Sequence, residues 1–368
     1  MKLRYKILIG VTIFIAIILI TAFLVLTFVP GFGKVPSSQM QKEYEKRADN
    51  FYDGTFHNLT DTAVLNSSVE KTDTTGVEIK PEGEIPVKII EEFPDINAEE
   101  FTITWFGHST AMLQMNGLNI FVDPVLSEIT SPVSFIGAKR FSDVPMTMEN
   151  VPEIDDLVLS HDHYDHLDYF TIKAIDDKVK QYVVPLGVES HLLRWGVDEA
   201  KIHTMAWWDE IEISNLKISS VPARHYSGRL PWKSDTTLWC GYVIASDKYQ
   251  VYYTGDTGYD TFFGDIYEKY GEMDLVLTEC GQYDPQWPTI HMFPKEVAKA
   301  MEEVHAKYVL PMHWGTFALS NHAWNASITD LTKESQNKNY MLITPQIGEI
   351  VNYKDIENYQ EKWWESIK

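Results

Sequence analysis

The sequence predicts an α/β domain that follows a single membrane-spanning helix. Between residues 99 and 355, short apolar runs typical of strands alternate with helical segments and turns, which indicates the α/β class. The chain has 368 residues and 44% of them are apolar, so we expect a large packed core. Near the N-terminus, one uncharged run is long enough to cross a bilayer.

The uncharged run covers residues 7–29 and would form a helix about 35 Å long. It can therefore span the hydrocarbon core of a bilayer, which is about 30 Å thick. The alternative is a cleaved signal peptide, but that class has a shorter apolar region and a small-residue cleavage site, which "LVLTFVPGFGK" lacks. Because Lys2, Arg4 and Lys6 precede the run, we expect a single-pass protein with residues 1–6 in the cytoplasm and the domain outside it.

Residues 30–98 are polar and interrupted by proline and glycine. We expect a linker here that packs in part on the domain, with a short helix within residues 37–50 after a serine cap. The domain itself is expected at residues 99–355, and a tail at residues 356–368.

Within the domain, each predicted strand is a short apolar run bounded by turn residues. In chain order the strands are expected at residues 101–107, 119–124, 156–160, 181–185, 216–223, 239–246, 250–256, 274–280 and 307–313. Helices are expected at residues 167–177, 188–196 and 294–306, where the apolar residues have helical spacing.

Charge and cysteine content exclude several classes of protein. The formal net charge is -22 at pH 7, so we expect no nucleic-acid partner, because affinity for nucleic acid comes from Lys and Arg on phosphates. The two cysteines, Cys240 and Cys280, lie far apart without CxxC spacing. They indicate neither a disulfide framework nor a cysteine zinc site, although a single disulfide is compatible with the sequence.

The segment "LSHDHYDHLD" (159–168) places three histidines and three aspartates directly after an apolar strand. His161 and His163 project to the same side of the chain, and Asp165 and His166 follow one turn later. Imidazole and carboxylate groups in this arrangement offer two adjacent coordination sites that suit zinc. The alternatives are a solvated polar loop or a helix cap, and Asp168 is expected to be only a cap.

One loop cannot complete two metal sites, so further ligands must come from elsewhere in the chain. His225, Asp256 and His313 each stand at the end of an apolar strand, where convergent loops would meet. Taken alone, each could be a core histidine or a turn aspartate. Their common position favours a shared site instead, and the two oxygens of Asp256 could bridge two metal ions.

The order HxHxDH, a single histidine, the aspartate of GDT and a final histidine resembles the metallo-β-lactamase superfamily. Within it, the chain resembles the branch that contains N-acylphosphatidylethanolamine-hydrolysing phospholipase D. The segments that carry the second resemblance are residues 105–141, 222–229, 252–259, 281–287 and 345–349, within a match over roughly residues 100–350. The resemblance implies an αββα four-layer sandwich with metal ions at one edge.

The resemblance also assigns roles to residues. It implies one zinc ion on His161, His163 and His225, a second on Asp165, His166 and His313, and Asp256 between them, although Mn²⁺ or Fe²⁺ are also compatible. Asp165 and Asp256 would thus be catalytic, as would His291, which corresponds to a histidine beside the substrate. For His291 the alternative is an ordinary residue at the start of a helix.

Other family positions carry weaker expectations. His108 and Asp123 are expected to hydrogen-bond the metal ligands, with turn packing as the alternative. Tyr283, Gln286 and His291 are expected to contact substrate. The chain departs from the family at Gln286, where a basic residue is expected, and at Cys280, where an apolar residue or proline is expected.

The function implied is that of a membrane-anchored dinuclear zinc hydrolase, a phospholipase D-type phosphodiesterase that cleaves N-acyl phosphatidylethanolamine-like lipids through a metal-bridging hydroxide. A lactonase of a phosphorylated or small soluble metabolite and a non-catalytic metal-binding surface module are the alternatives. A homodimer is also compatible with the resemblance. Apolar segments at residues 129–137, 207–208, 261–267 and 363–364 are candidates for membrane contact, with core packing as the alternative.

Overall fold

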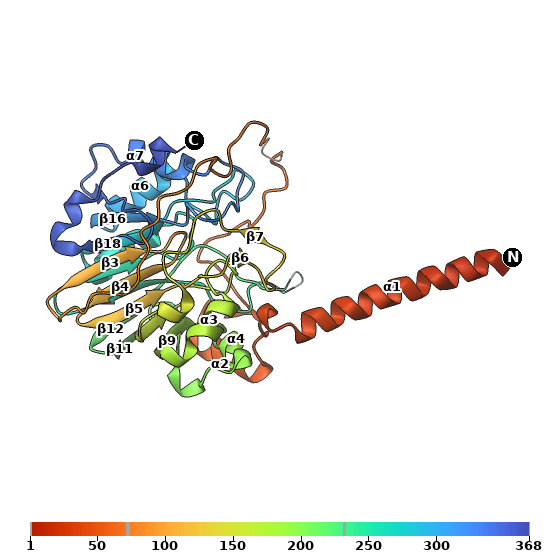
Figure 1. Ribbon diagram of the computed structural model, residues 1–368. Coiled ribbons are helices and arrows are strands. Elements are labelled where there is room, and N and C mark those ends of the chain that lie inside the picture. Colours follow the sequence, from red (N-terminus) through yellow and green to blue (C-terminus); the bar gives the residue numbers. More distant parts are fainter. Residues whose placement is uncertain (1, 71–73, 231–232, 368) are drawn as a thin grey trace.

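A computed structural model describes residues 2–70, 74–230 and 233–367, so Met1 of the expected basic tip and Lys368 of the expected tail lie outside the described residues. Within this part of the chain, two seven-stranded sheets face each other, and helices cover both outer faces (Figure 1). The domain is therefore the four-layer αββα sandwich that the sequence resemblance implies.

The first sheet has the strand order β10-β9-β8-β5-β4-β3-β18. Its strands are β3 (Phe101–Trp105), β4 (Ala111–Met115), β5 (Leu118–Val122), β8 (Ile154–Val158), β9 (Val179–Pro185), β10 (Ile202–Met205) and β18 (Ile350–Asn352). β5, β8, β9 and β10 run parallel to one another, whereas β4 is antiparallel to both of its neighbours.

The second sheet has the strand order β11-β12-β13-β14-β15-β16-β17. Its strands are β11 (Glu210–Ile213), β12 (Leu216–Val221), β13 (Gly241–Ala245), β14 (Gln250–Tyr253), β15 (Met273–Glu279), β16 (Ala306–Met312) and β17 (Met341–Leu342). β14 to β17 are parallel, and because β13 is antiparallel to both β12 and β14, β12 also runs in their direction.

Side chains alternate between the two faces of each strand, as the pleat requires. On β5, Ile120 and Val122 enter the core between the sheets, whereas Phe121 faces the outer helices. Both faces are apolar because each sheet is covered on both sides.

The outer helices divide into two sets (Figure 1). α3 (Tyr169–Ile175) and α4 (Glu189–Trp195) pack on the first sheet, and α5 (Phe262–Tyr270), α6 (Pro294–Glu303) and α7 (Ala326–Glu334) pack on the second. Short 3-10 helices lie at Pro30–Phe32, Met148–Asn150, Asp176–Lys178, Glu199–Lys201, Tyr353–Asn358 and Trp363–Ser366.

Two of the apolar segments considered for membrane contact belong to the core. Residues 261–267 lie largely in α5, where Phe262, Phe263 and Ile266 are buried against the second sheet. Trp363 and Trp364 are also buried, and they pack on Trp314. The membrane interpretation is wrong for these segments because the helical spacing and the long-range packing place their apolar faces inward.

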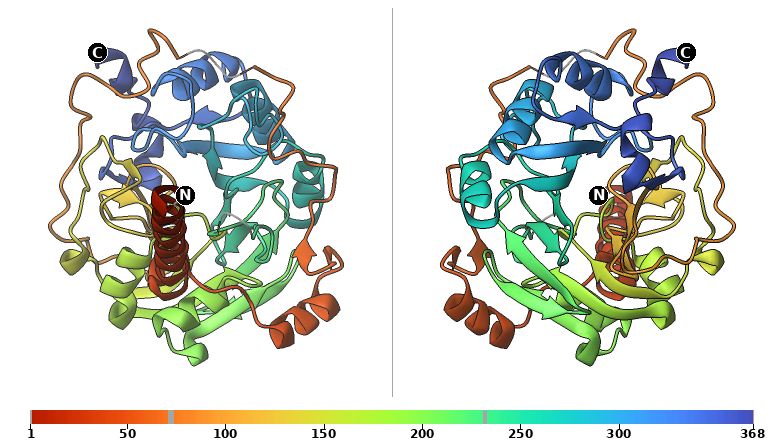
Figure 2. Two further views of the ribbon diagram at one scale, coloured as in Figure 1. Left: turned by 90° about the vertical axis from the view of Figure 1, so that its right-hand side faces the viewer. Right: turned by 90° about the vertical axis from the view of Figure 1, so that its left-hand side faces the viewer.

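The N-terminal region consists of α1 (Lys2–Phe28), which projects from the domain, and α2 (Ser38–Arg47), which packs on it (Figure 1). In α2, Tyr44 donates a hydrogen bond to the buried Glu189. The short hairpin of β1 (Phe51–Tyr52) and β2 (Thr55–Phe56) follows, and residues 57–70 and 74–100 then run along the outside of the layers (Figure 2).

A small hairpin of β6 (Ile129–Thr130) and β7 (Ala138–Lys139) stands beside the first sheet. It lies on the side of the domain from which α1 departs (Figure 1). The sequence did not predict this hairpin or β4, because their runs are short or lack clear alternation.

The sheets bring distant residues to one edge. β3, β5 and β8 in the first sheet share one direction, and so do β12, β14 and β16 in the second. The loops that follow these strands carry His108, Asp123, residues 161–166, His225, Asp256 and His313. Parallel strands end at the same edge, so these loops can meet there.

A buried carboxyl in β8 makes the stability of the fold pH-dependent. Asp156 accepts a hydrogen bond from Ser214 Oγ (3.1 Å), no partner within the described residues reaches Oδ2, and burial raises the pKa of Asp156 to about 6. A raised pKa means that the ionised form destabilises the folded state, by no more than about 3 kcal/mol. This cost is present above pH of about 6 and disappears as the pH falls toward about 4.

We therefore expect the Asp156→Asn variant to gain stability relative to the parent at neutral pH and to lose that advantage in acid. Thermal unfolding of the detergent-solubilised protein across this pH range measures the difference. Asp155→Asn is the control. Asp155 is the neighbouring carboxyl in β8, but unlike Asp156 it is paired with a cation, Lys180 (2.7 Å). A difference between Asp156→Asn and the parent that does not change with pH would contradict the assignment.

Candidate metal centre

The loop after β8 is held in a fixed shape by hydrogen bonds. Leu159 N donates to Val183 O in the neighbouring strand, and His166 N and Leu167 N donate to His163 O, which closes the turn. Asp168 caps α3 by accepting from Phe170 N and Thr171 N, as expected from the sequence. The side chains of His161, His163, Asp165 and His166 therefore leave this loop in fixed directions.

A second set of contacts holds the loop from outside. The carboxylate of Asp162 accepts from Gly228 N (2.8 Å) and from His191 Nε2 (3.1 Å). The buried Arg229 guanidinium donates to Asp162 O (2.6 Å) and Leu167 O (2.8 Å). Burial opposes ionisation of Asp162, but His191 outweighs it and holds the pKa of the carboxyl well below its usual value.

His225, Asp256 and His313 meet this loop from the second sheet. Four imidazole Nε2 atoms lie around one carboxylate oxygen, Asp256 Oδ2. Their distances to it are 3.9 Å for His161, 3.1 Å for His166, 3.8 Å for His225 and 3.2 Å for His313. Asp256 thus stands between the two groups of residues that the sequence analysis separated.

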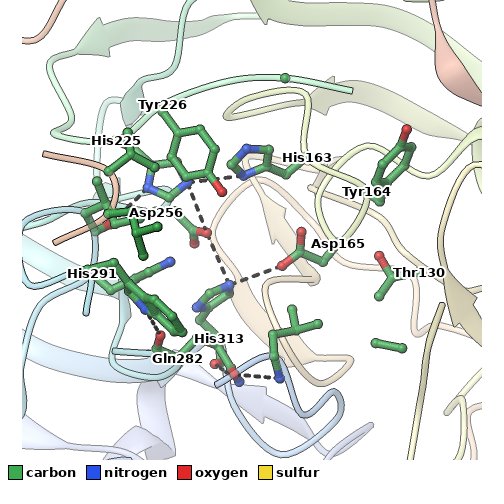
Figure 3. A pocket seen from close by; sticks show the side chains of 17 residues that line it. Thr130, His163, Tyr164, Asp165, His225, Tyr226, Asp256, Gln282, His291 and His313 are labelled. Atoms are coloured by element: carbon green, nitrogen blue, oxygen red, sulfur yellow. Dashed lines mark hydrogen bonds and ion pairs between the residues drawn. The ribbon is translucent and has the colours of Figure 1, made fainter. Parts of the chain in front are cut away.

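The first group comprises His161, His163, His225 and Asp256, whose ligand atoms lie within 4.8 Å of one another. His163 Nδ1 is 2.8 Å from His161 Nε2 and 3.2 Å from His225 Nε2. Figure 3 shows His163, His225 and Asp256 turned toward one another.

The second group comprises His108, Asp165, His166 and His313. Asp165 Oδ2 lies 3.4 Å from His313 Nε2 and 3.7 Å from His166 Nε2. His108 Nε2 contacts the same oxygen at 3.0 Å. His108 therefore makes a direct contact with Asp165, which favours the hydrogen-bonding role over turn packing.

Hydrogen bonds on the opposite ring nitrogens orient the imidazoles. His166 Nδ1 donates to Asp123 Oδ2 (2.6 Å), and His225 Nδ1 donates to Ile290 O (2.9 Å). His313 Nδ1 faces Gly281 O at 3.4 Å. These contacts fix the ring orientations that turn Nε2 toward the group around Asp256.

Burial shapes the protonation of the groups. It lowers the pKa of His225 to about 3 and that of His161 well below its usual value. For His166 burial acts in the same direction, but Asp256 and Asp165 outweigh it and raise the pKa well above its usual value. The carboxylates of Asp256 and Asp165 therefore stabilise positive charge between the two groups.

Two of these buried atoms, His166 Nε2 and Asp256 Oδ1, have no hydrogen-bond partner within the described residues. Unpartnered polar atoms in a buried site are costly, and coordination to a cation would satisfy them. Nitrogen and carboxylate ligands in this combination suit Zn²⁺, Fe²⁺ or Mn²⁺. The residues therefore fit metal ions in both groups.

His291 lies beside the groups, against a carboxylate that the sequence analysis missed. Its Nδ1 is 3.0 Å from Glu279 Oε2, and Glu279 Oε1 accepts from Met292 N (2.6 Å). Both side chains are buried. The sequence could have indicated Glu279, because it stands at the end of the predicted strand 274–280 and the other site residues also stand at strand ends.

A cavity of about 530 Å³ opens over the centre (Figure 3). Its polar wall includes His163, Asp165, His225, Asp256, His291 and His313, and its apolar wall includes Val64, Leu65, Ala138, Ile290 and Leu319. The apolar wall comes from segments far apart in the sequence.

Tyr283 and Gln286, expected to contact substrate, do not line this cavity. The ring of Tyr283 packs on Phe293 and His322, which turns it away from the centre. Gln282 and Trp287 of the same segment line the cavity instead.

The chain matches the model of one protein family, and its sequence is similar to those of several known proteins. The Beta-lactamase superfamily domain matches residues 118–314. An uncharacterised protein of Mycobacterium tuberculosis is 33% identical over 321 residues, which cover 83% of this chain and 85% of that protein. The N-acyl-phosphatidylethanolamine-hydrolyzing phospholipase D 1 of Caenorhabditis elegans is 31% identical over 269 residues, covering 68% of this chain and 76% of that protein.

Solved structures support the fold. Igni18, a metallo hydrolase from Ignicoccus hospitalis, superimposes with a TM-score of 0.53 at 21% identity and covers 69% of this chain and 98% of its own. CmlA, a diiron β-hydroxylase from Streptomyces venezuelae, also gives 0.53 at 17% identity, covering 71% of this chain and 55% of its own. A shared fold with such different reactions leaves the chemistry to the residues of the site.

Metal analysis of purified variants tests the two groups. His225→Ala should remove metal from the first group only, whereas Asp256→Asn should lower the content of both, because Oδ2 lies between them. Inductively coupled plasma mass spectrometry of the full chain measures the stoichiometry. His203→Ala is the control, since His203 is half-buried in β10 and pairs with Gln181. Equal metal content in His225→Ala and His203→Ala would contradict the assignment.

Proposed function

Because the chain belongs to the beta-lactamase superfamily, we propose that it is a membrane-anchored phosphodiesterase of the phospholipase D type, acting on N-acyl phosphatidylethanolamine-like lipids. The observation that carries this proposal is the cavity, in which the charged centre faces a wall of apolar side chains. A phosphodiester with acyl chains matches both surfaces. The similarity to the nematode phospholipase D supports the same substrate class.

Two metal ions, which we propose to be zinc, would be held by residues of the two groups. His161, His163 and His225 would hold one, Asp165, His166 and His313 the other, and Asp256 would contact both. When bound, such a pair lowers the pKa of coordinated water to about 7 and stabilises negative charge on a phosphoryl group.

The protein's own residues would handle the leaving group. His291 lines the cavity, and its Nδ1 pairs with Glu279, so its Nε2 is the nitrogen available to substrate. As water adds to phosphorus, Nε2 would take up the proton that the water releases, and it would pass this proton to the alcohol oxygen as the bond between that oxygen and phosphorus breaks. The products are a phosphatidate and an N-acylethanolamine.

Glu279 would position His291 for this transfer. Its second oxygen is fixed by Met292 N, so the carboxylate cannot rotate away from the imidazole. A carboxylate that holds one ring nitrogen fixes the tautomer and the ring orientation.

The N-terminal helix fits a lipid substrate. The segment Arg4–Phe28 is apolar and exposed along its length, as a membrane span requires, although a signal sequence has the same character. We propose that it anchors the protein with the N-terminus in the cytoplasm, because the basic residues precede it.

The substrate proposal is tested on the full chain in lipid vesicles that contain N-acyl phosphatidylethanolamine. We expect mass spectrometry to detect N-acylethanolamine and a phosphatidate that carries ¹⁸O from labelled water, because attack occurs at phosphorus. Asp256→Asn should abolish both products. Hydrolysis of phosphorylated lactones without cleavage of the lipid would overturn the proposal and favour a lactonase.

The role of Glu279 is tested by changing the leaving group. Glu279→Gln should lower the turnover of diesters with alkyl alcohol leaving groups about 10- to 100-fold, because His291 loses its orientation. Diesters that release p-nitrophenol need little protonation and should be affected much less. Glu296→Gln, which alters a nearby carboxylate at the start of α6, is the control. Equal losses on both substrate classes would contradict a role in proton transfer.

A further inference from the structure

We propose that five apolar side chains around the cavity opening form a docking surface for a zwitterionic bilayer. This mouth surface consists of Val64, Leu65, Phe135, Ile136 and Leu319. It would bring the opening onto the membrane that holds α1, so that lipid enters from that membrane. The entry of substrate rests on the proposed function, whereas the docking itself does not.

The mouth surface is unusually exposed for apolar residues. Phe135 is 74% exposed and Ile136 67% exposed, and Phe135 is the most exposed large apolar side chain that the structure describes. Leu65 is 61% exposed. Contiguous exposed apolar side chains at the edge of a pocket mark a contact site with a partner or a membrane.

Three separate segments build this surface. Val64 and Leu65 belong to the segment that runs around the domain, and Leu319 follows β16. All three line the cavity. Phe135 and Ile136 lie in the loop between β6 and β7, whose ends, Thr130 and Ala138, also line it. The three segments that carry these exposed side chains therefore all border the same cavity.

The base of α1 is fixed next to the same loop. Gly31 packs so closely on Pro132 of the β6–β7 loop that a Cβ at position 31 would lie 2.1 Å from Pro132 O. Arg194 donates to Thr27 O (2.6 Å) and Gly33 O (2.6 Å), which secures the end of the helix. A helix that spans a bilayer would thus hold the β6–β7 loop close to the membrane surface.

Arg229 connects the base of α1 to the metal centre. Its Nη2 donates to Gly31 O (2.7 Å), while its Nη1 donates to Asp162 O and Leu167 O of the loop after β8. The anchor, the cavity and the mouth surface consequently share one side of the domain. Figure 1 shows α1 leaving from the side that carries β6 and β7.

Charge selects the kind of membrane. The chain has 53 acidic and 31 basic residues, so an anionic bilayer would repel the domain. Insertion of apolar side chains into a phosphatidylcholine surface needs no such attraction. A zwitterionic bilayer is therefore the occupant that the composition favours.

Depth labelling tests docking without reference to any substrate. Cys240 and Cys280 are both buried, so a single introduced cysteine can be labelled selectively. Ile136→Cys and the control Ile89→Cys are reconstituted as full chains in phosphatidylcholine vesicles and labelled with an environment-sensitive fluorophore. Ile89 has the same 67% exposure as Ile136 but does not line the cavity.

We expect the label at residue 136 to be shielded from a water-soluble quencher and the label at residue 89 to remain accessible. Equal accessibility at the two positions would overturn the proposal. Shielding at residue 136 that persists in detergent and increases with protein concentration would also overturn it, because a second copy of the chain would then cover the surface.

Activity separates docking from substrate identity. The double variant F135S/I136S should cleave N-acyl phosphatidylethanolamine in vesicles about 10- to 100-fold more slowly, while cleavage of a short-chain soluble diester stays unchanged. Ile89→Ser should change neither rate. A shielded label without lipid cleavage would leave docking intact and refute the proposed substrate, whereas full vesicle activity in F135S/I136S would refute docking.

Discussion

Two buried carboxylates, Asp165 and Asp256, stand among the imidazoles of five histidines at one edge of the sandwich, and the rest of the structure depends on holding these groups together. Buried charges are costly unless they are paired or coordinate a cation. The two rigid sheets hold these charged groups together despite the cost of burying them, because the strands end at the positions that the side chains occupy. The extensive apolar core between the sheets supplies the stability that such a site consumes.

The residues that hold the centre are as informative as the centre itself. Asp123 receives hydrogen bonds from His166 and from Tyr253 OH (2.6 Å), so a carboxylate in one sheet is fixed by groups from both. Glu279 gives His291 a similar support on the side of the cavity. These contacts set which ring nitrogen faces the centre, and this choice decides whether an imidazole can act as a ligand or as a proton donor.

The segment at the end of α1 is part of the domain's architecture and is more than an appended piece of chain. Residues 30–34 fill a position between the β6–β7 loop and α4, and Lys34 N donates to His191 Nδ1 (2.9 Å). His191 in turn contacts Asp162 in the loop after β8. A continuous set of hydrogen bonds therefore runs from the end of α1 to the centre, and it orients the opening relative to the helix.

The sequence alone determined the chemical groups of the centre, their place at strand ends and the apolar helix, because these are local patterns of residue type and spacing. It also indicated Asp168 as a cap. Only the tertiary structure decided which faces turn inward: Tyr283 points away from the cavity, Trp364 enters the core and Glu279 meets His291. The physical reason is that these outcomes depend on packing between segments distant in the chain, which local periodicity does not record.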